Sequence, residues 1–367
     1  MSLFLKRVVV SSSLFRPLSL ISCPLSKTNT CSFHIPGMSA EMLDIVQQYR
    51  HQQQYRGERD QALVGVSMES APNYPLLSDR DFLAHFDILA TLEPPEEEKK
   101  DERKVSSADS TSKKQKRVWY SYYDDMFRRC WEAEGNPAAS FATVATTNNS
   151  KTTLSLHLSH IRENAIAYVN SNCDTKTDRD KIVKELADLL QPLGVPLHSF
   201  GACLNNMPRT ARSDSKIETL RRYKYCVAIE NSEDRHYVSE KVYDAFVAGC
   251  VPIYFGAPNV LDYVPHVDAI IDVRSLGGVR GAAEEIAMLA ADDEAYASKH
   301  AWRDRPETWS EGFKRLQEQT WRDGVGPFEK CDTTMGGLSD PHMMRQCAIC
   351  RAVAEWRESG GKAKREN

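Results

Sequence analysis

Short apolar runs alternate with amphipathic stretches from about residue 161 onward. The runs are of strand length, and the stretches between them have helical periodicity. Strands are expected at 166–169, 195–200, 225–229, 251–255 and 269–273, and helices at 178–190, 218–222, 238–248 and within 280–300. Such alternation is typical of a parallel sheet with helices on both faces. We therefore predict an α/β, Rossmann-like domain over residues 161–330.

Two of these helices have readable boundaries. The first follows a cap at Thr177 or Asp178 and has its apolar face at Ile182, Leu186, Leu189 and Leu190. The second carries a stripe at Val238, Val242 and Phe246, and Gly249 ends it. Both helices begin directly after a predicted strand and a polar loop, which places their N-termini at the carboxyl edge of the sheet.

The pattern in residues 41–160 is weaker. A helix is expected first, and then a strand at 62–67, which leads into a loop containing two prolines at 68–75. A short helix and a second strand at 87–91 follow. Residues 93–117 include fifteen charged residues, too many for a stretch that buries apolar surface, so we predict a disordered insertion there. We interpret 41–160 as a smaller N-terminal domain.

The two ends of the chain differ from the rest in composition. Residues 1–40 are rich in serine and have no acidic residue before Glu41, which is typical of a targeting segment, and we expect them to lie outside the fold. No run there reaches the roughly 18–20 apolar residues of a membrane span. The net charge of −4 and the lack of a basic stripe argue against a nucleic-acid partner.

Three cysteines lie in the C-terminal segment, residues 331–367. Cys331 is followed by a C-x-x-C pair at Cys347 and Cys350, and the whole chain has ten cysteines. Free buried thiols and disulfides formed in an oxidising lumen both fit this placement. Zinc is disfavoured because no second ligand pair stands at the usual spacing.

Cationic residues stand at the two helix starts described above. Arg179 lies in the first turn of the 178–190 helix, and Lys241 follows Ser239 and Glu240 at the start of the next. A helix N-terminus attracts anions through its free N–H groups and its dipole. Two added cations make a diphosphate clamp, and a neighbouring carboxylate suits a ribose hydroxyl. The spacing alone therefore predicts a nucleotide-like ligand at this edge of the sheet.

Residues 223–241, YKYCVAIENSEDRHYVSEK, resemble the signature of the α1,3-fucosyltransferases of glycosyltransferase family ten. In that family the pattern runs approximately Y-K-F-x-L-x-F-E-N-S, a short spacer, and Y-[VI]-T-E-K. The V-P-I run at 251–253 with Gly256, the Ser171-Asn-Cys element with Arg179, and the C-x-x-C end are also similar to it. The resemblance extends from about Leu63 to Cys350.

The resemblance implies a GT-B fold, in which two Rossmann-like domains face each other across a cleft. It implies GDP-fucose as the donor, with Arg179 and Lys241 holding the diphosphate and Glu240 contacting the ribose. Further donor-pocket residues would be Glu230, Asn231, Tyr237 and Ser239, where Ser239 replaces the threonine usual in the family. No cofactor or metal would be required, since the cations and the helix end meet the charge of the leaving diphosphate.

The catalytic base would come from the N-terminal domain. The sequence Met68-Glu-Ser-Ala-Pro72 resembles the family's E-S-P element with one inserted alanine, which makes Glu69 the candidate. A single base suffices for an inverting displacement. The implied activity is hexosyl transfer of L-fucose to a GlcNAc hydroxyl of a glycan or glycoprotein in α1,3 linkage.

Two other functions fit the same residues: a non-catalytic GDP-sugar-binding relative, and a GT-B transferase that uses another nucleotide sugar. Core N-glycan GlcNAc and antenna N-acetyllactosamine both remain open as acceptors. Family members are usually type II membrane proteins of the Golgi apparatus, so the resemblance also implies that location, although no anchor-like apolar run is found in this sequence.

Overall fold

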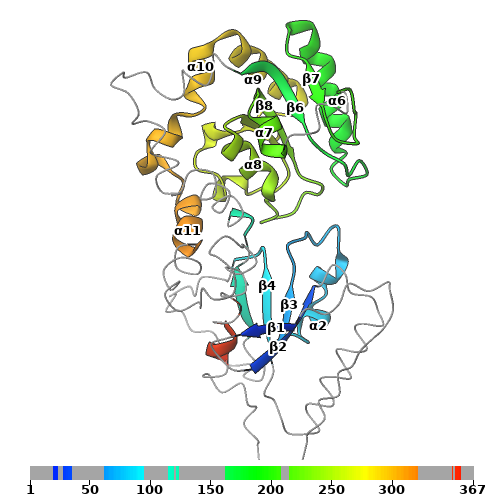
Figure 1. Cartoon of the computed structure of the whole chain (residues 1–367), viewed down its shortest axis with the longest axis vertical. Coiled ribbons are helices and arrows are strands. Elements are labelled where there is room, and N and C mark those ends of the chain that lie inside the picture. Colours follow the sequence, from blue (N-terminus) through cyan, green and yellow to red (C-terminus); the bar gives the residue numbers. More distant parts are fainter. Residues whose placement is uncertain are drawn as a thin grey trace, which may run out of the picture.

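The protein forms two α/β units, each built on a five-stranded sheet (Figure 1). The structure is a computed structural model, and it describes residues 20–23, 28–34, 62–94, 115–119, 121–123, 162–207, 215–320, 349 and 352–356. Several predictions lie outside these residues: the helix expected within 41–61, most of the 93–117 insertion, and the three C-terminal cysteines.

The first sheet has the strand order β1-β2-β3-β4-β5. Its strands are β1 (Leu20–Cys23), β2 (Thr28–His34), β3 (Leu63–Val66), β4 (Ile88–Thr91) and β5 (Lys116–Trp119). Strand β1 is antiparallel to β2, and all other pairs are parallel. The apolar runs of β3 and β4 are almost entirely buried, as expected of central strands in a parallel sheet. Between these two strands lie η2 (Pro75–Ser78) and α2 (Arg80–Leu83).

This sheet differs from the sequence-based predictions at two places. Residues 20–23 and 28–34 form strands, so these parts of the 1–40 segment belong to the fold instead of lying outside it. Lys116 and Arg117, at the end of the predicted insertion, lie in β5. Both are charged residues at the start of a strand, where local composition is a poor guide because pairing with β4 decides the conformation.

The second sheet is entirely parallel and confirms the prediction of a Rossmann-like domain. Its strand order is β10-β9-β8-β6-β7. Its strands are β6 (Glu163–Tyr168), β7 (Leu197–Ser199), β8 (Tyr223–Ile229), β9 (Val251–Phe255) and β10 (Ile271–Asp272). Its helices are α6 (Arg179–Leu190), α7 (Lys216–Leu220), α8 (Glu240–Ala248), α9 (Val279–Ala291), α10 (Asp293–Ser298) and α11 (Glu311–Thr320). The short 3-10 turns are η3 (Gln191–Leu193), η5 (Val260–Asp262), η6 (Val267–Ala269), η7 (Ala301–Asp304) and η8 (Pro306–Thr308).

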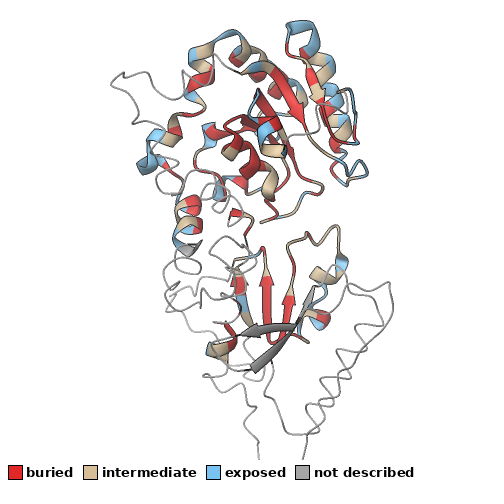
Figure 2. Cartoon of the chain, viewed as in Figure 1, coloured by how far each residue is buried: buried red, intermediate tan, exposed pale blue. Residues whose placement is uncertain are grey.

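The sheet is buried between helical layers (Figure 2). Helices α6 and α9 pack against each other in one apolar cluster with β6 and β8, whereas α8 and α11 belong to a second cluster. The buried face of α6 carries Val183, Leu186 and Leu190, while Ile182 and Leu189 are only partly buried. Among the helices of the described ranges, none combines the length and the apolar character needed to cross a bilayer.

The two units are interlocked by chain segments that cross between them. Tyr123, which follows β5, is 1% exposed and packs edge-to-face on Tyr243 of α8 and Phe313 of α11. In return, the C-terminal residues Ile349, Ala352 and Val353 pack on the first sheet. Each unit therefore includes in its core residues from a distant part of the sequence. Local sequence patterns do not predict such contacts.

The carboxyl edges of the two sheets face each other. The loop after β3 contacts the loop after β8: Ser70 Oγ lies 2.5 Å from Ser232 Oγ, and Asn73 Nδ2 donates to Asn231 Oδ1 at 2.9 Å. Two Rossmann-like units opposed in this way are the GT-B arrangement that the sequence resemblance implies.

Glycines with positive φ end two segments of the second unit and allow a matched stability test. Gly249 (φ 76°) follows α8 as predicted, and Gly194 (φ 80°) follows η3. A Cβ on Gly249 would lie 2.7 Å from Arg162 Nη2, whereas one on Gly194 would meet nothing within 4 Å. Arg162 has little room to yield because its guanidinium donates to the carbonyls of Tyr223 and Ala248.

We expect Gly194→Ala to lower the free energy of unfolding by about 1–2 kcal/mol, which is the cost of a left-handed alanine. Gly249→Ala should lose this amount and about 1 kcal/mol more, because displacing Arg162 breaks a buried hydrogen bond. Urea denaturation of both variants measures the difference. Equal losses of unfolding free energy in the two variants would show that Arg162 can move away from the added methyl group without cost.

Candidate active site

The strand order places a topological switch point between β6 and β8. Strand β7 lies on the far side of β6 and β9 on the far side of β8, so the chain leaves these neighbouring strands in opposite directions. In doubly wound sheets, ligands bind in the crevice at such a point, outside the carboxyl ends of the strands. The loop after β6 leads to Arg179, and the loop after β8 leads to Lys241. The tertiary structure thus brings the two predicted cations to one place.

Arg179 is the first residue of α6, directly after Asp178 with φ 51°. Its side chain is 1% exposed and donates Nε to Tyr168 Oη at 3.2 Å, Nη1 to the Ile229 carbonyl at 3.1 Å and Nη2 to the Asn172 carbonyl at 2.5 Å. The guanidinium thereby ties the ends of β6 and β8 together. All three acceptors are neutral, so they fix the cation without cancelling its charge.

Glu230 organises the start of α8. It follows β8 directly, is fully buried, and its carboxylate accepts from Ser239 N at 2.7 Å, from Ser239 Oγ at 2.6 Å and from Lys241 Nζ at 3.2 Å. Ser239 is the N-cap of α8, and its hydroxyl accepts from the Lys241 amide at 3.5 Å. Glu230 therefore acts by holding the cap and the lysine at the helix N-terminus.

The ammonium group of Lys241 has three oxygen neighbours: Glu230 Oε2, Ser239 Oγ at 2.8 Å and Glu240 Oε1 at 3.5 Å. Burial favours the neutral amine, but the charges of Glu230 and Glu240 outweigh it and raise the pKa of Lys241. Arg179 acts in the opposite direction, which shows that the two cations are close enough to interact. Lys241 is thus a largely shielded cation, with its side chain 15% exposed, at a helix N-terminus.

Glu240 is the first residue of α8, and its side chain is 32% exposed. Burial disfavours its ionisation, but Lys241 and Lys216 outweigh this effect and lower the pKa of Glu240. The carboxylate is therefore ionised at neutral pH and partly accessible, as an acceptor for a sugar hydroxyl must be. Asn231, by contrast, is engaged with Asn73 of the first unit through its side-chain oxygen.

Glu69 lies in the loop after β3 and faces the second unit. Tyr237 Oη donates to Glu69 Oε2 at 3.3 Å. Burial raises the pKa of Glu69, and the Tyr237 hydrogen bond and the charge of Lys241 oppose this rise in part. A half-buried carboxylate with a raised pKa has the chemistry of a general base. Of the eight predicted site residues, the structure thus gathers all at the meeting edges of the two sheets.

Several neighbours of this site escaped the sequence analysis. Thr177 Oγ1 donates to the Glu230 carbonyl at 2.7 Å, and Asp234 Oδ2 accepts from the Ala71 amide of the first unit at 2.9 Å. His236 adopts φ 68°, and its amide donates to Asn259 Oδ1 at 3.0 Å. Their partners are remote in the sequence, so the sequence pointed to Thr177 only as a cap candidate, and only the polar character of the 231–237 loop could have pointed to Asp234 and His236.

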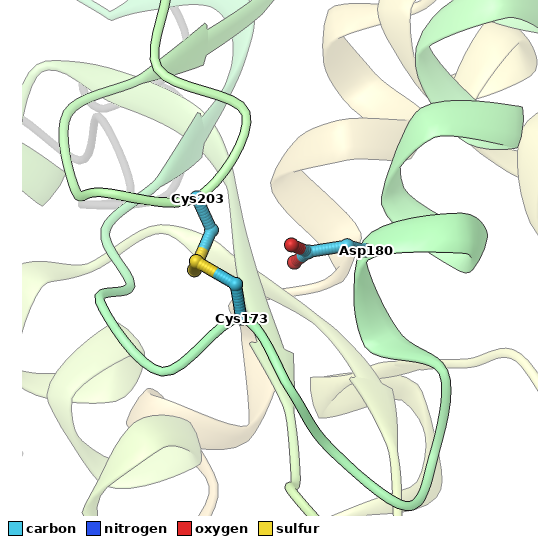
Figure 3. A group of neighbouring side chains, drawn as sticks. All are labelled: Cys173, Asp180 and Cys203. Atoms are coloured by element: carbon cyan, nitrogen blue, oxygen red, sulfur yellow. A yellow bond between two sulfur atoms is a disulfide. The ribbon is translucent and has the colours of Figure 1, made fainter.

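One group of potential metal ligands occurs within the described ranges: Cys173, Asp180 and Cys203, whose ligand atoms lie within 4.8 Å of one another (Figure 3). The two cysteines form a disulfide, and a second disulfide joins Cys226 to Cys250. Oxidised sulfur offers no thiolate, so this group does not fit a metal ion. The Cys173–Cys203 disulfide instead ties the loop after β6, whose Asn172 carbonyl binds Arg179, to the loop after β7.

The role of Glu230 can be tested against its neighbour Glu240. Glu230→Gln removes the buried charge that faces Lys241, and breaking a buried ion pair costs about 3–5 kcal/mol. Glu240→Gln removes a partly exposed charge 3.5 Å from the same ammonium and should cost about 1 kcal/mol or less. Chemical denaturation of both variants measures the difference, and similar losses would contradict the organising role of Glu230.

Comparison with known proteins supplies the family. Residues 159–359, more than half of the chain, match the model of glycosyltransferase family 10 (fucosyltransferase), C-terminal part. An alpha-(1,4)-fucosyltransferase of Arabidopsis thaliana is 34% identical over 165 residues, which cover 40% of this chain and 40% of that protein. The GDP-fucose protein O-fucosyltransferase 3 of Gallus gallus is 32% identical over 199 residues, 52% of this chain and 39% of that protein.

The chain spans about two fifths of the length of these curated relatives. Among solved structures, a crystal structure of an alpha1,3-fucosyltransferase with GDP-fucose aligns with a TM-score of 0.43 at 19% identity, covering 66% of each chain. The match to the family model includes both helix starts of the candidate site, Arg179 and Lys241. On this match, the chain belongs to glycosyltransferase family 10, the fucosyltransferases.

Proposed function

We propose that this protein transfers L-fucose from GDP-β-L-fucose to a GlcNAc hydroxyl of a glycan, forming an α1,3 linkage with inversion at the anomeric carbon. The observation that carries the proposal is the opposition of two groups. The cationic helix start of Lys241 lies in the second unit, and the carboxylate of Glu69 meets the same site from the first. A transferase needs both: a place for a leaving diphosphate and a base for the incoming hydroxyl.

The donor would bind at the switch point of the second sheet. Arg179 and Lys241 hold two positive charges there, and the dipole of α8 adds partial positive charge at its N-terminus. A diphosphate would exchange the weakest contact of Lys241, that to Glu240 at 3.5 Å, for a phosphate oxygen. The carboxylate of Glu240 would then be available to a ribose hydroxyl, and Glu230 would keep the lysine in place.

The base would be Glu69. Its carboxylate takes the proton of the acceptor hydroxyl while the acceptor oxygen forms a bond to the anomeric carbon. The bond from that carbon to the diphosphate oxygen breaks, and the negative charge passes to the site of Arg179 and Lys241. One displacement inverts the anomeric centre, so a second carboxylate nucleophile is not required.

Two further properties belong to this proposal. The protein cations and helix dipole meet the charge of the leaving group, so we propose that transfer requires no metal ion or other cofactor. By family resemblance we also propose a location in the Golgi apparatus with membrane association, where glycan acceptors are processed.

A hydroxyl group of a protein is a second candidate acceptor. It is favoured by the 32% identity over 199 residues to a GDP-fucose protein O-fucosyltransferase 3. Both acceptor classes present a hydroxyl to the same base and use the same donor site. The choice between them therefore depends on the acceptor side of the first unit.

Transfer from GDP-fucose to a panel of glycan and protein acceptors tests the reaction, with product linkage determined by mass spectrometry and NMR. We expect Glu69→Gln to lower kcat about 10²–10⁴-fold, because the acceptor proton loses its base. The control Glu163→Gln alters a half-exposed carboxylate of β6 and should leave kcat unchanged. Equal rates for Glu69→Gln and the wild type would remove Glu69 from the mechanism, and no turnover by the wild type would favour a binding protein.

Lys241→Ala tests the donor site by isothermal titration with GDP. Loss of a largely shielded cation that would face phosphate should weaken GDP binding by about 2–5 kcal/mol. Lys314→Ala, on α11, is the control and should bind GDP normally. In competition experiments GDP should bind more tightly than UDP. Unchanged affinity of Lys241→Ala, or a preference for UDP, would overturn the donor assignment.

A further inference from the structure

We propose that the loop of the donor-binding unit from Asn231 to Tyr237 orients the base of the opposite unit, with Tyr237 as the positioning residue of Glu69. The inference rests on the proposed function, because it assumes that Glu69 is the base. It assigns Tyr237 to the base, whereas the sequence resemblance assigns it to the donor pocket.

The loop after β8 is docked on the loop that carries Glu69. Besides Tyr237, three of its side chains contact residues immediately after Glu69. They are Ser232 to Ser70 Oγ at 2.5 Å, Asp234 to the Ala71 amide at 2.9 Å, and Asn231 to Asn73 Nδ2 at 2.9 Å. Four hydrogen bonds over such a short length fix the base loop against the donor unit more closely than any single contact could.

The carboxylate and the backbone of Glu69 are held by different units. In the first unit, Ser67 Oγ accepts from the Glu69 amide at 3.1 Å, and Tyr122 Oη donates to the Met68 carbonyl at 3.0 Å. The hydrogen bond to the carboxylate itself comes from Tyr237 in the second unit. The direction of the base therefore depends on the donor unit, while its own unit supplies the backbone position.

Tyr237 is well placed to transmit the position of the donor site. It is 3% exposed, and it lies two residues before Ser239, the cap that Glu230 holds. The preceding residue, His236, has φ 68° and is fixed through Asn259. Both a buried cap and a left-handed residue resist rotation of this segment, so the tyrosine hydroxyl has a defined position relative to Lys241.

The groups that face Glu69 determine how its pKa changes when the Tyr237 hydrogen bond is removed. Tyr237 and Lys241 lower the pKa of Glu69, while Glu240 and Glu230, together with burial as the largest effect, raise it. Removing the tyrosine hydroxyl removes one lowering contribution. The pKa of Glu69 then rises, the base stays protonated up to a higher pH, and the acidic limb of the kcat/KM profile moves to higher pH.

Tyr237→Phe, measured as fucose transfer from GDP-fucose across pH, tests the inference. We expect kcat to fall about tenfold, the acidic limb to move upward by about half a pH unit or more, and the KM for GDP-fucose to stay within about twofold. Tyr223→Phe removes a hydroxyl at the opposite end of β8, bonded to His198, and should leave both the rate and the profile unchanged. An unmoved acidic limb with a raised donor KM would overturn the proposal and return Tyr237 to the donor pocket.

Two further variants keep the outcome decisive. Ser232→Ala loosens the docked loop without touching Tyr237 and should lower kcat with the donor KM preserved, whereas an unchanged kcat would contradict the role of the loop even if Tyr237→Phe failed to fold. Glu69→Gln in the same pH series separates the two levels of inference. If Glu69→Gln retains the acidic limb, the assigned base is wrong. If Glu69→Gln loses the limb but Tyr237→Phe leaves it at its wild-type pH, the positioning role alone is wrong.

Discussion

The buried carboxylate of Glu230 is the interaction on which the site depends. It has no exposed surface, and it compensates its burial by accepting from the amide and hydroxyl of Ser239 and from the ammonium of Lys241. The same contacts define where α8 begins and hold the charged Lys241 side chain, which is 15% exposed, at the helix start. Glu230 directly follows β8, the central strand of the sheet. Its hydrogen bonds therefore fix the position of the α8 N-terminus relative to the sheet.

Arg179 complements this arrangement from the neighbouring strand. Its guanidinium donates to neutral acceptors at the ends of β6 and β8. These hydrogen bonds hold the side chain in one position, and they do not neutralise its positive charge. The Cys173–Cys203 disulfide restrains the same loop from the other side. A switch point between two buried strands, each followed by a fixed cation, is suited to hold a diphosphate with little reorganisation.

Both apolar and polar contacts join the two units. Apolar contacts at Tyr123 and at the C-terminal residues of the chain interlock the cores, while the polar contacts from Ser70 and Ala71 connect the loops at the site itself. Glu69 and the two cations thus belong to different units but share one hydrogen-bonded boundary. In the proposed reaction, the proton acceptor and the groups that stabilise the leaving diphosphate would therefore come from different units.

The sequence by itself determined the strands and most of the helices of the second unit, although α11 was not predicted. Apolar runs became the strands β6 to β10, Ser239 capped α8 and Gly249 ended it, because capping, periodicity and left-handed glycine are local properties. The signature at 223–241 also identified the family and six of the eight predicted site residues, and the other two, Glu69 and Arg179, came from shorter elements upstream. These features depend on neighbours within a few positions along the chain, where residue type alone carries the information.

Only the tertiary structure decided how distant segments combine. It showed that Glu230 faces inward to Ser239 and Lys241, that Tyr237 reaches Glu69 across the two units, and that Cys173 pairs with Cys203. It also recruited residues 28–34 into the first sheet next to β3. Each of these contacts joins positions whose local sequence is compatible with several partners, and the packing within and between the two units selects one of them.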